Sequence, residues 1–288
     1  MIDLHVHSTM SDGTYSPSEL MKLAKEKGLQ AIALTDHDSI SGNAEAKKAA
    51  KQYEVKFIQG MEMSLNYNNR QIHVVALGFD ENNPAFRDFY ADLRQRKQAS
   101  IIKVINYLSE KEGLNISVDK VTPFINGGAL DKYAILRYLI KEEASKGDIQ
   151  YLWDTYIDPA FNNLKLRTVE NPNAKDAIKA IKLAGGVTSL AHYHKRIGFK
   201  GCTREEQENQ IKELHELGLD GMEAYYPNYT EDDEQFAHYL IKKYDLLPTG
   251  GTDFHGKNRP AIDLGTGNNN NMNVPFAFYE SICKHISR

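Results

Sequence analysis

Histidine and carboxylate side chains recur in this sequence just after predicted β-strands. The motif His-x-His occurs twice, at His5/His7 and His192/His194, whereas the composition predicts about 0.3 such pairs by chance. No histidine occurs between His73 and His192. Imidazoles and carboxylates that meet in space bind divalent metal ions, so the pattern indicates one shared metal site. The residues concerned are His5 and His7, Asp36-His37-Asp38, Glu62, His73, His192, Asp253 and His255.

The elements that must position these residues alternate between strand and helix. Ser16-Pro17-Ser18-Glu19 supplies an N-cap, a first-turn proline and a capping-box glutamate, and Thr203 to Glu206 forms a second capping box. This alternation predicts a mainly parallel sheet covered by helices. In a parallel α/β barrel the carboxyl ends of the strands share one face, so side chains that follow different strands converge there. The predicted strands are residues 2–7, 30–34, 55–58, 72–77, 187–191, 221–225 and 247–251.

The hydrophobic periodicity and the composition of the sequence change between residues 84 and 166. Apolar residues there follow a helical period, and the segment has few glycines and no histidine. We interpret residues 84–166 as a helical insertion into the barrel. The barrel itself then comprises residues 1–83 and 167–288.

Composition excludes several classes of protein. The 288 residues carry a net charge of −4, and Lys and Arg form no dense block, so no stable nucleic-acid complex is expected. The apolar runs are too short to span a bilayer, and Met1 leads directly into the first strand without a signal peptide. Cys202 and Cys283 lack metal-knuckle spacing and are expected to be free thiols. We therefore expect a cytoplasmic protein that has no membrane partner, and its oligomeric state is not predicted.

Buried histidines that serve only structure are the alternative to a metal site. For a single residue such as His73, both interpretations remain open. For the whole set the structural interpretation is weak, because five separate strand ends would each carry a good ligand by accident. Asp12, in Ser11-Asp12-Gly13, could simply shape a turn. His215, His238 and His285 lie in helical patterns among polar residues and are expected at the surface.

The motifs that contain the candidate ligands, taken together and in their order along the chain, closely resemble those of the polymerase and histidinol phosphatase (PHP) family. The resemblance extends from the first residues to about Gly256, apart from the helical segment. It implies a distorted (β/α)₇ TIM-like barrel, a site for two or three metal ions, and phosphoesterase activity on small phosphorylated metabolites or nucleotides. The motifs are Asp3-Leu4-His5-Val6-His7-Ser8, Ser11-Asp12-Gly13, Thr35-Asp36-His37-Asp38, Gly60-Met61-Glu62, Ala191-His192 and Gly251-Thr252-Asp253-Phe254-His255-Gly256.

The resemblance also implies how the ligands are shared among the ions. Glu62 would bridge two of them. Nine ligands over three ions leave open positions for water and substrate, and ligands without cysteine suit Zn²⁺, Mn²⁺ or Fe²⁺. The implied sets are His5, His7, Glu62 and Asp253 for the first metal; Glu62, His73 and His192 for the second; and Asp12, His37 and His255 for the third.

Charge favours a phosphate substrate in such a site. Three divalent ions bring +6, and Asp12, Glu62 and Asp253 bring −3, which leaves about +3 to attract a phosphate dianion. A bridging water would be acidified toward a pKa of roughly 7, so we expect attack of metal-bound hydroxide on phosphorus. His194 is the candidate for protonating the leaving group. The alternative is that His194 is only a solvent-exposed neighbour of His192 without a catalytic role.

Further candidates surround the proposed ligands. For each cation named below, the alternative to substrate binding is a solvated charge on a loop. For each tyrosine, the alternative to lining a pocket is ordinary packing. The cations that could bind substrate phosphate are Lys195, Arg196, Lys257 and Arg259; the carboxylates that could orient ligating histidines are Asp36, Asp38 and Glu223; and the tyrosines that could line a pocket are Tyr225, Tyr226 and Tyr229.

Two stretches depart from the family's pattern for binding substrate. An Arg-Pro-His-like element that contacts phosphate in nucleotide-cleaving relatives is matched here by Leu130-Asp131-Lys132-Tyr133. The usual Ala-His-Pro-Gly-Arg becomes Ala191-His192-Tyr193-His194-Lys195. A metallohydrolase of another bond, such as an amide, and a catalytically idle metal-binding module are the alternatives to a phosphoesterase.

Overall fold

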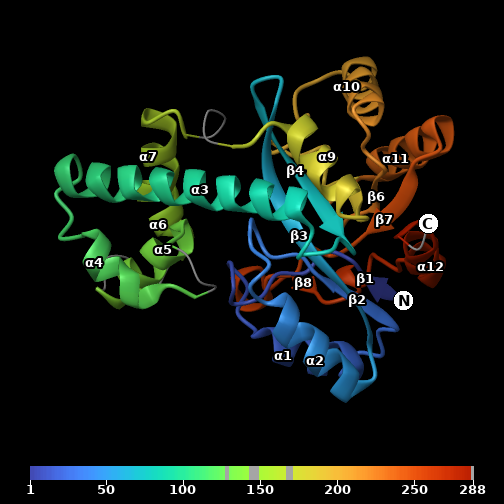
Figure 1. Ribbon diagram of the computed structural model, residues 1–288, viewed down its shortest axis with the longest axis horizontal. Coiled ribbons are helices and arrows are strands. Elements are labelled where there is room, and N and C mark those ends of the chain that lie inside the picture. Colours follow the sequence, from blue (N-terminus) through green and yellow to red (C-terminus); the bar gives the residue numbers. More distant parts are fainter. Residues whose placement is uncertain (127–129, 143–148, 167–170, 287–288) are drawn as a thin grey trace.

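Seven strands form one sheet in the computed structural model, which describes residues 1–126, 130–142, 149–166 and 171–286. Strand order in the sheet follows the chain from β1 to β7 (Figure 1). The outer pairs, β1–β2, β2–β3, β5–β6 and β6–β7, are parallel, so the mainly parallel α/β sheet predicted from the sequence is confirmed. The strands are β1 (Ile2–Asp3), β2 (Ala31–Leu34), β3 (Lys56–Tyr67), β4 (Arg70–Leu77), β5 (Val187–Leu190), β6 (Gly221–Tyr225) and β7 (Leu247–Gly250).

The closed barrel is not confirmed, because the ladder is open between β1 and β7. The segments that follow these two strands nevertheless run side by side. The Leu4 amide donates to the Gly250 carbonyl at 3.1 Å, and the Asp253 amide donates to the His5 carbonyl at 2.8 Å. These bonds bring the first and last predicted ligand motifs together.

The centre of the sheet is an antiparallel hairpin, which the sequence pattern did not predict. β3 pairs antiparallel with β4, and β4 pairs antiparallel with β5. Asn68 and Asn69 join β3 to β4 with φ angles of 48° and 59°. Two residues with positive φ make the tight turn that connects adjacent antiparallel strands, whereas a parallel connection needs a crossover of about a dozen residues. β3 is therefore longer than predicted, and Glu62 lies within it rather than after it.

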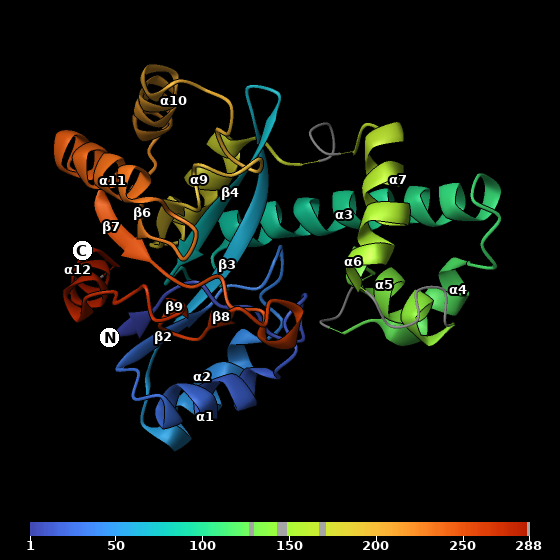
Figure 2. The ribbon, with the colours of Figure 1, turned by 180° about the vertical axis from the view of Figure 1, so that it is seen from behind.

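Helices pack along the outside of the sheet, as the alternating pattern predicted (Figure 2). Both predicted capping boxes are present: Ser16 with Glu19, and Thr203 with Glu206. No helix in the described ranges is both long enough and apolar enough to cross a membrane. The helices around the sheet are α1 (Pro17–Glu26), α2 (Asn43–Tyr53), α9 (Ala174–Leu183), α10 (Arg204–Glu216), α11 (Glu231–Tyr244) and α12 (Phe276–Ile286); a short 3₁₀ turn (Gly256–Asn258) and the strand pair β8 (Ile262–Asp263) and β9 (Gly267–Asn268) follow β7.

The segment from residue 84 to residue 166 is helical in its described part and extends to one side of the sheet (Figures 1 and 2). Its first helix, α3, runs through two hydrophobic cores. Phe86 and Leu93 pack with residues of the sheet, whereas Ile101 and Leu108 pack with the other helices of the segment. The helices are α3 (Pro84–Glu110), α4 (Val118–Val121), a 3₁₀ turn (Thr122–Phe124), α5 (Lys132–Lys141), α6 (Ile149–Leu152), a π-helical turn (Trp153–Ile157) and α7 (Asp158–Asn163).

The division into a barrel and an insertion stays a prediction. The separate hydrophobic core of residues 101–166 is in keeping with it. The predicted boundary at residue 167 lies outside the described residues. We call residues 84–166 the helical insertion below.

Truncating a buried side chain in the insertion core tests its contribution to stability. Leu108 is fully buried, so Leu108→Ala should lower the free energy of unfolding by about 2–5 kcal/mol through lost burial and the cavity left behind. Urea unfolding followed by fluorescence measures this, because Trp153, the single tryptophan, lies among the same residues. Asn106→Ala, at an exposed position of the same helix, is the control. Equal stability of the two variants would contradict this assignment of the core.

Candidate metal centre

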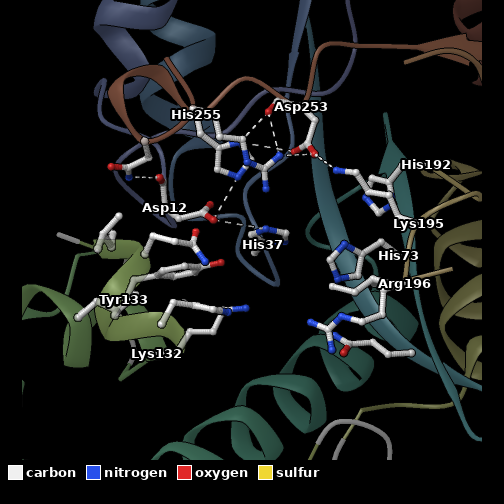
Figure 3. A pocket seen from close by; sticks show the side chains of 18 residues that line it. Asp12, His37, His73, Lys132, Tyr133, His192, Lys195, Arg196, Asp253 and His255 are labelled. Atoms are coloured by element: carbon white, nitrogen blue, oxygen red, sulfur yellow. Dashed lines mark hydrogen bonds and ion pairs between the residues drawn. The ribbon is translucent and has the colours of Figure 1, made fainter. Parts of the chain in front are cut away.

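The nine residues predicted to ligate metal come together at one end of the sheet. Figure 3 shows those that line the adjoining cleft: Asp12, His37, His73, His192, Asp253 and His255. His5 and His7 follow β1, His37 follows β2, and His192 follows β5. Glu62 and His73 face each other across the hairpin, one on β3 and one on β4. Asp253 and His255 follow β7, and Asp12 lies in the loop before α1. Their roles as ligands remain a proposal.

Glu62 is the centre of this cluster. Its buried carboxylate lies within 3.4 Å of five imidazoles. Two oxygens cannot accept well-directed hydrogen bonds from five rings, so the arrangement is better explained by ions shared among them. Oε1 is 2.8 Å from His73 Nδ1, 2.9 Å from His192 Nε2 and 3.3 Å from His5 Nε2; Oε2 is 2.8 Å from His37 Nδ1 and 3.4 Å from His7 Nε2.

Three groups of ligand atoms are compact enough to hold a metal ion, each with its atoms within 4.8 Å of one another. The first has the membership that the family resemblance implies. The other two differ from the implied sets, because His37 joins Glu62 and His73, and His7 joins the Asp12 group. His192 lies beside Glu62 but outside these groups. They are His5, His7, Glu62 and Asp253; His37, Glu62 and His73; and His7, Asp12, His37 and His255.

Several buried polar atoms of the cluster make no hydrogen bond to any described residue. Such atoms are costly to bury without a partner, so a cluster of them fits bound cations. Imidazole nitrogens and carboxylate oxygens are also the donor set that divalent transition metals prefer. The atoms are Nε2 of His5, His7 and His255, Nδ1 of His37 and His192, Oδ1 of Asp12 and Oε2 of Glu62.

Ionisation in the cluster also suits cation binding. Burial alone would raise the pKa of Glu62, but His73, His5 and His37 outweigh it and hold that pKa well below its usual range. Burial, reinforced by neighbouring imidazoles, lowers the pKa of His7 to about 3. Burial likewise lowers the pKa of His73 to about 4, against the pull of Glu62. At neutral pH Glu62 is therefore charged and His7 and His73 are neutral, as metal ligation requires. Nearby carboxylates, Glu62 first, instead raise the pKa of His5 and His37 against the effect of burial.

Two of the predicted ligands have a strained backbone. His192 and Asp253 have φ angles of 29° and 53°, in the left-handed region that non-glycine residues rarely adopt. Strain of this kind persists only where surrounding contacts impose it, and it gathers at functional sites. The backbone is thus held in unfavourable turns that direct His192 toward Glu62, at 2.9 Å, and Asp253 toward His7, at 3.1 Å.

The three predicted supporting carboxylates have different partners. Glu223 contacts two predicted ligands: Oε1 is 2.7 Å from His5 Nδ1, and Oε2 accepts from the His192 amide at 2.6 Å. Asp36 instead accepts from the hydroxyls of Ser8 and Ser11, at 2.7 and 2.6 Å, and so holds the loop that carries Asp12. Asp38 accepts from the Ser64 amide at 2.8 Å. In this structure Glu223 alone of the three contacts a predicted ligand's ring.

A cleft of about 440 Å³ lies against the cluster, a size typical of pockets that bind small molecules. Lys195, Arg196 and Arg259 line it, as predicted for substrate-binding cations, and Lys257 does not. Lys195 and Arg259 both contact Asp253 Oδ2, at 3.5 and 2.5 Å. Arg196 lies 3.7 Å from Asp158. Each of these three cations therefore already has a carboxylate partner.

His194 and the three tyrosines occupy different surroundings. His194 does not line the cleft, and its ring packs 4.9 Å from that of Tyr229. Tyr226 donates to Asp253 Oδ2 at 2.8 Å, and Tyr229 donates to the Glu223 carbonyl at 3.2 Å. Tyr225 packs instead near His238. The geometry thus places Tyr226, rather than His194, beside the cluster, and the catalytic role of His194 stays a prediction.

The helical insertion supplies a wall of the cleft that faces the cluster (Figure 3). The Tyr133 ring stacks 6.1 Å from His37 and 6.3 Å from Trp153, and Lys132 Nζ lies 4.9 Å from the centre of the Tyr133 ring. The sequence analysis did not assign these residues to the site. The only signal in the sequence was the departure from the family pattern at Leu130-Asp131-Lys132-Tyr133. The residues could not be placed from it, because α5 reaches the cleft through packing between distant parts of the chain.

Comparison with known proteins agrees with this geometry. A 5′-3′ exoribonuclease of Haemophilus influenzae is 31% identical over 91% of this chain and 95% of its own. A phosphoribosyl 1,2-cyclic phosphate 1,2-diphosphodiesterase of Eggerthella lenta is 27% identical over 88% of this chain and 94% of its own. A solved structure from Bifidobacterium adolescentis, described as a metal-dependent phosphoesterase, shares the fold with a TM-score of 0.84 at 24% identity and covers 100% of this chain and 98% of its own. Residues 3–245 match the PHP domain, and the chain belongs to that family.

Proposed function

We propose that this protein is a metal-dependent phosphoesterase that hydrolyses a small phosphorylated metabolite or a nucleotide. The observation that carries the proposal is the buried Glu62 carboxylate surrounded by five imidazoles at the end of an open cleft. The relatives' names support the reaction class, because an exoribonuclease and a cyclic phosphate diphosphodiesterase both cleave phosphoesters. The fold alone would not do so, since one fold hosts many chemistries.

Two or three divalent ions, Zn²⁺, Mn²⁺ or Fe²⁺, would be held by the nine clustered side chains. Bound there, they would supply a more acidic water at neutral pH and positive charge for the phosphoryl oxygens. The protein's own part is to keep its ligands deprotonated and correctly aimed. Glu223 fixes the His5 ring, and Tyr226 and Arg259 fix one oxygen of Asp253, which leaves the other oxygen facing His5 and His7.

Lys132 is the best candidate for binding an anionic group of the substrate. No ion pair or hydrogen bond from a described residue reaches its ammonium group, unlike those of the other described cations that line the cleft. Burial lowers its pKa, and the carboxylates of Asp12, Asp38 and Asp131 offset this only in part, so an anion that entered the cleft would further stabilise the charged ammonium. Lys132 is also the first residue of α5, and the positive end of the helix dipole there favours anions.

Removing the metal ions, or one charged ligand, should abolish hydrolysis. Chelation of the purified protein should stop phosphate release from a nucleoside monophosphate, and added Mn²⁺ or Zn²⁺ should restore it. Asp253→Asn keeps the shape of the side chain but removes its charge, so kcat/KM should fall by on the order of 100-fold or more. Asp263→Asn, at the exposed surface, is the matched control. Turnover that survives both chelation and Asp253→Asn would refute the proposal.

Removing the Lys132 ammonium should weaken substrate binding while leaving metal binding intact. A hydrogen bond to a charged group contributes about 1.5–3 kcal/mol, so Lys132→Ala should lower kcat/KM by about 10- to 100-fold, mainly by raising KM. Steady-state kinetics with a nucleoside monophosphate and a nucleoside bisphosphate measures the change for one and two phosphates. Lys200→Ala removes an exposed lysine as the control. An unchanged KM for both substrates would exclude the role.

A further inference from the structure

Asp38, in the turn after β2, is connected to two of the proposed metal ligands, His37 and Glu62. It follows His37 directly in the chain, and its amide donates to the carbonyl of Glu62 at 2.8 Å. Its φ angle is 49°, so this non-glycine residue is held in the left-handed region. A conformation of this kind needs contacts that impose it. Any group that fixes Asp38 therefore also fixes the backbone on which His37 and Glu62 are mounted.

Helix α3 of the insertion supplies two of those contacts. Lys97 Nζ lies 3.0 Å from Asp38 Oδ2, and Arg94 Nη1 donates to the Asp38 carbonyl at 2.8 Å. The other carboxylate oxygen, Oδ1, accepts from the Ser64 amide on β3 at 2.8 Å. Asp38 is thus bonded through its amide, its carbonyl and both carboxylate oxygens. Two of these four positions are held by a helix that belongs to the insertion rather than to the sheet.

The Lys97–Asp38 pair is not an ordinary surface ion pair. The two side chains are only 22% and 11% exposed, and Lys97 Nζ also donates to Asn171 Oδ1 at 2.6 Å. A pair of this kind is screened little by solvent, and loss of one partner leaves a buried charge uncompensated. The contrast lies one residue away on the same helix. Arg96 pairs with Asp92, and both side chains are about half exposed, as expected of a pair that contributes little.

We infer that Lys97 and Arg94 are positioning residues for the metal centre. They hold the Asp38 turn in its left-handed conformation and, through it, keep His37 and Glu62 at the separation that metal binding needs. The helical insertion is therefore part of the metal site's support as well as a wall of the cleft. This inference rests on the proposed function, since it concerns the ions that the nine clustered side chains would hold.

Metal binding, measured without any substrate, tests this role. Full-length protein stripped with a chelator would be titrated with Mn²⁺ by isothermal calorimetry. Lys97→Met should weaken at least one class of Mn²⁺ site by about 10- to 100-fold, the usual effect of removing a group that orients a ligand. Lys97→Arg keeps a cation in reach of Asp38 and should restore most of the affinity. Arg96→Met should bind Mn²⁺ like the unaltered protein, as the matched control.

A double-mutant cycle separates positioning from general destabilisation. Asp38→Asn removes the charge that Lys97 contacts but keeps an oxygen for the Ser64 amide. If Lys97 acts through Asp38, Lys97→Met should add little to the loss already caused by Asp38→Asn. Should Lys97→Met protein fail to fold, Asp38→Asn alone provides the test and should show the same 10- to 100-fold loss. Thermal unfolding of the metal-free variants would show whether each protein is folded.

Three results would overturn the inference. They are Mn²⁺ affinity of Lys97→Met and Asp38→Asn equal to that of the unaltered protein, an equal loss in Arg96→Met, and a full additive loss in the double variant. Failure of the proposed function looks different, because the unaltered protein itself would then bind no Mn²⁺ or would bind it without hydrolysing a phosphoester.

Discussion

The burial of the Glu62 carboxylate is the constraint on which the rest of the structure depends. A charged carboxylate removed from water loses several kcal/mol of solvation, and only nearby positive charge or well-directed donors can offset this. Five imidazoles contact Glu62, yet burial and mutual repulsion keep at least His7 and His73 neutral at neutral pH. Hydrogen bonds with His73 and His192, at 2.8 and 2.9 Å, supply part of the compensation. Cations held by this donor set would supply more.

The sheet topology follows from the need to bring these groups together. A parallel sheet alone presents its strand ends in a row, whereas the antiparallel hairpin of β3 and β4 places Glu62 and His73 side by side within strands. The hydrogen bonds between the segments after β1 and β7 then bring His5 and Asp253 to the same place. Gly251 permits this approach, because a Cβ there would lie 2.4 Å from the backbone nitrogen of His5.

Local rules predicted much of this arrangement, and long-range packing accounts for what they missed. The capping boxes at Ser16 and Thr203 mark helix starts that the structure contains. The strands lie where an apolar run is followed by a histidine or an acidic residue. The hairpin was missed because the alternation of strands and helices was taken to indicate a mainly parallel sheet throughout. Lys132 and Lys97 were missed for a different reason. Apart from the departure from the family pattern at Leu130-Asp131-Lys132-Tyr133, nothing near them in the sequence indicates which part of the sheet their helices meet, since that depends on the packing of α3 and α5.

Helix α3 links the metal cluster to the wall of the cleft that the insertion supplies, because it runs through both hydrophobic cores. Its first half packs on the sheet and carries Arg94 and Lys97 against the Asp38 turn, and its second half packs with the helices that present Lys132 to the cleft. If Lys132 binds substrate and the cluster binds metal as proposed, both contacts would act on elements that pack against α3. By linkage, any effect of bound metal on substrate affinity would be matched by an equal effect of substrate on metal affinity. On these proposals, a single helix of the insertion would support both kinds of binding.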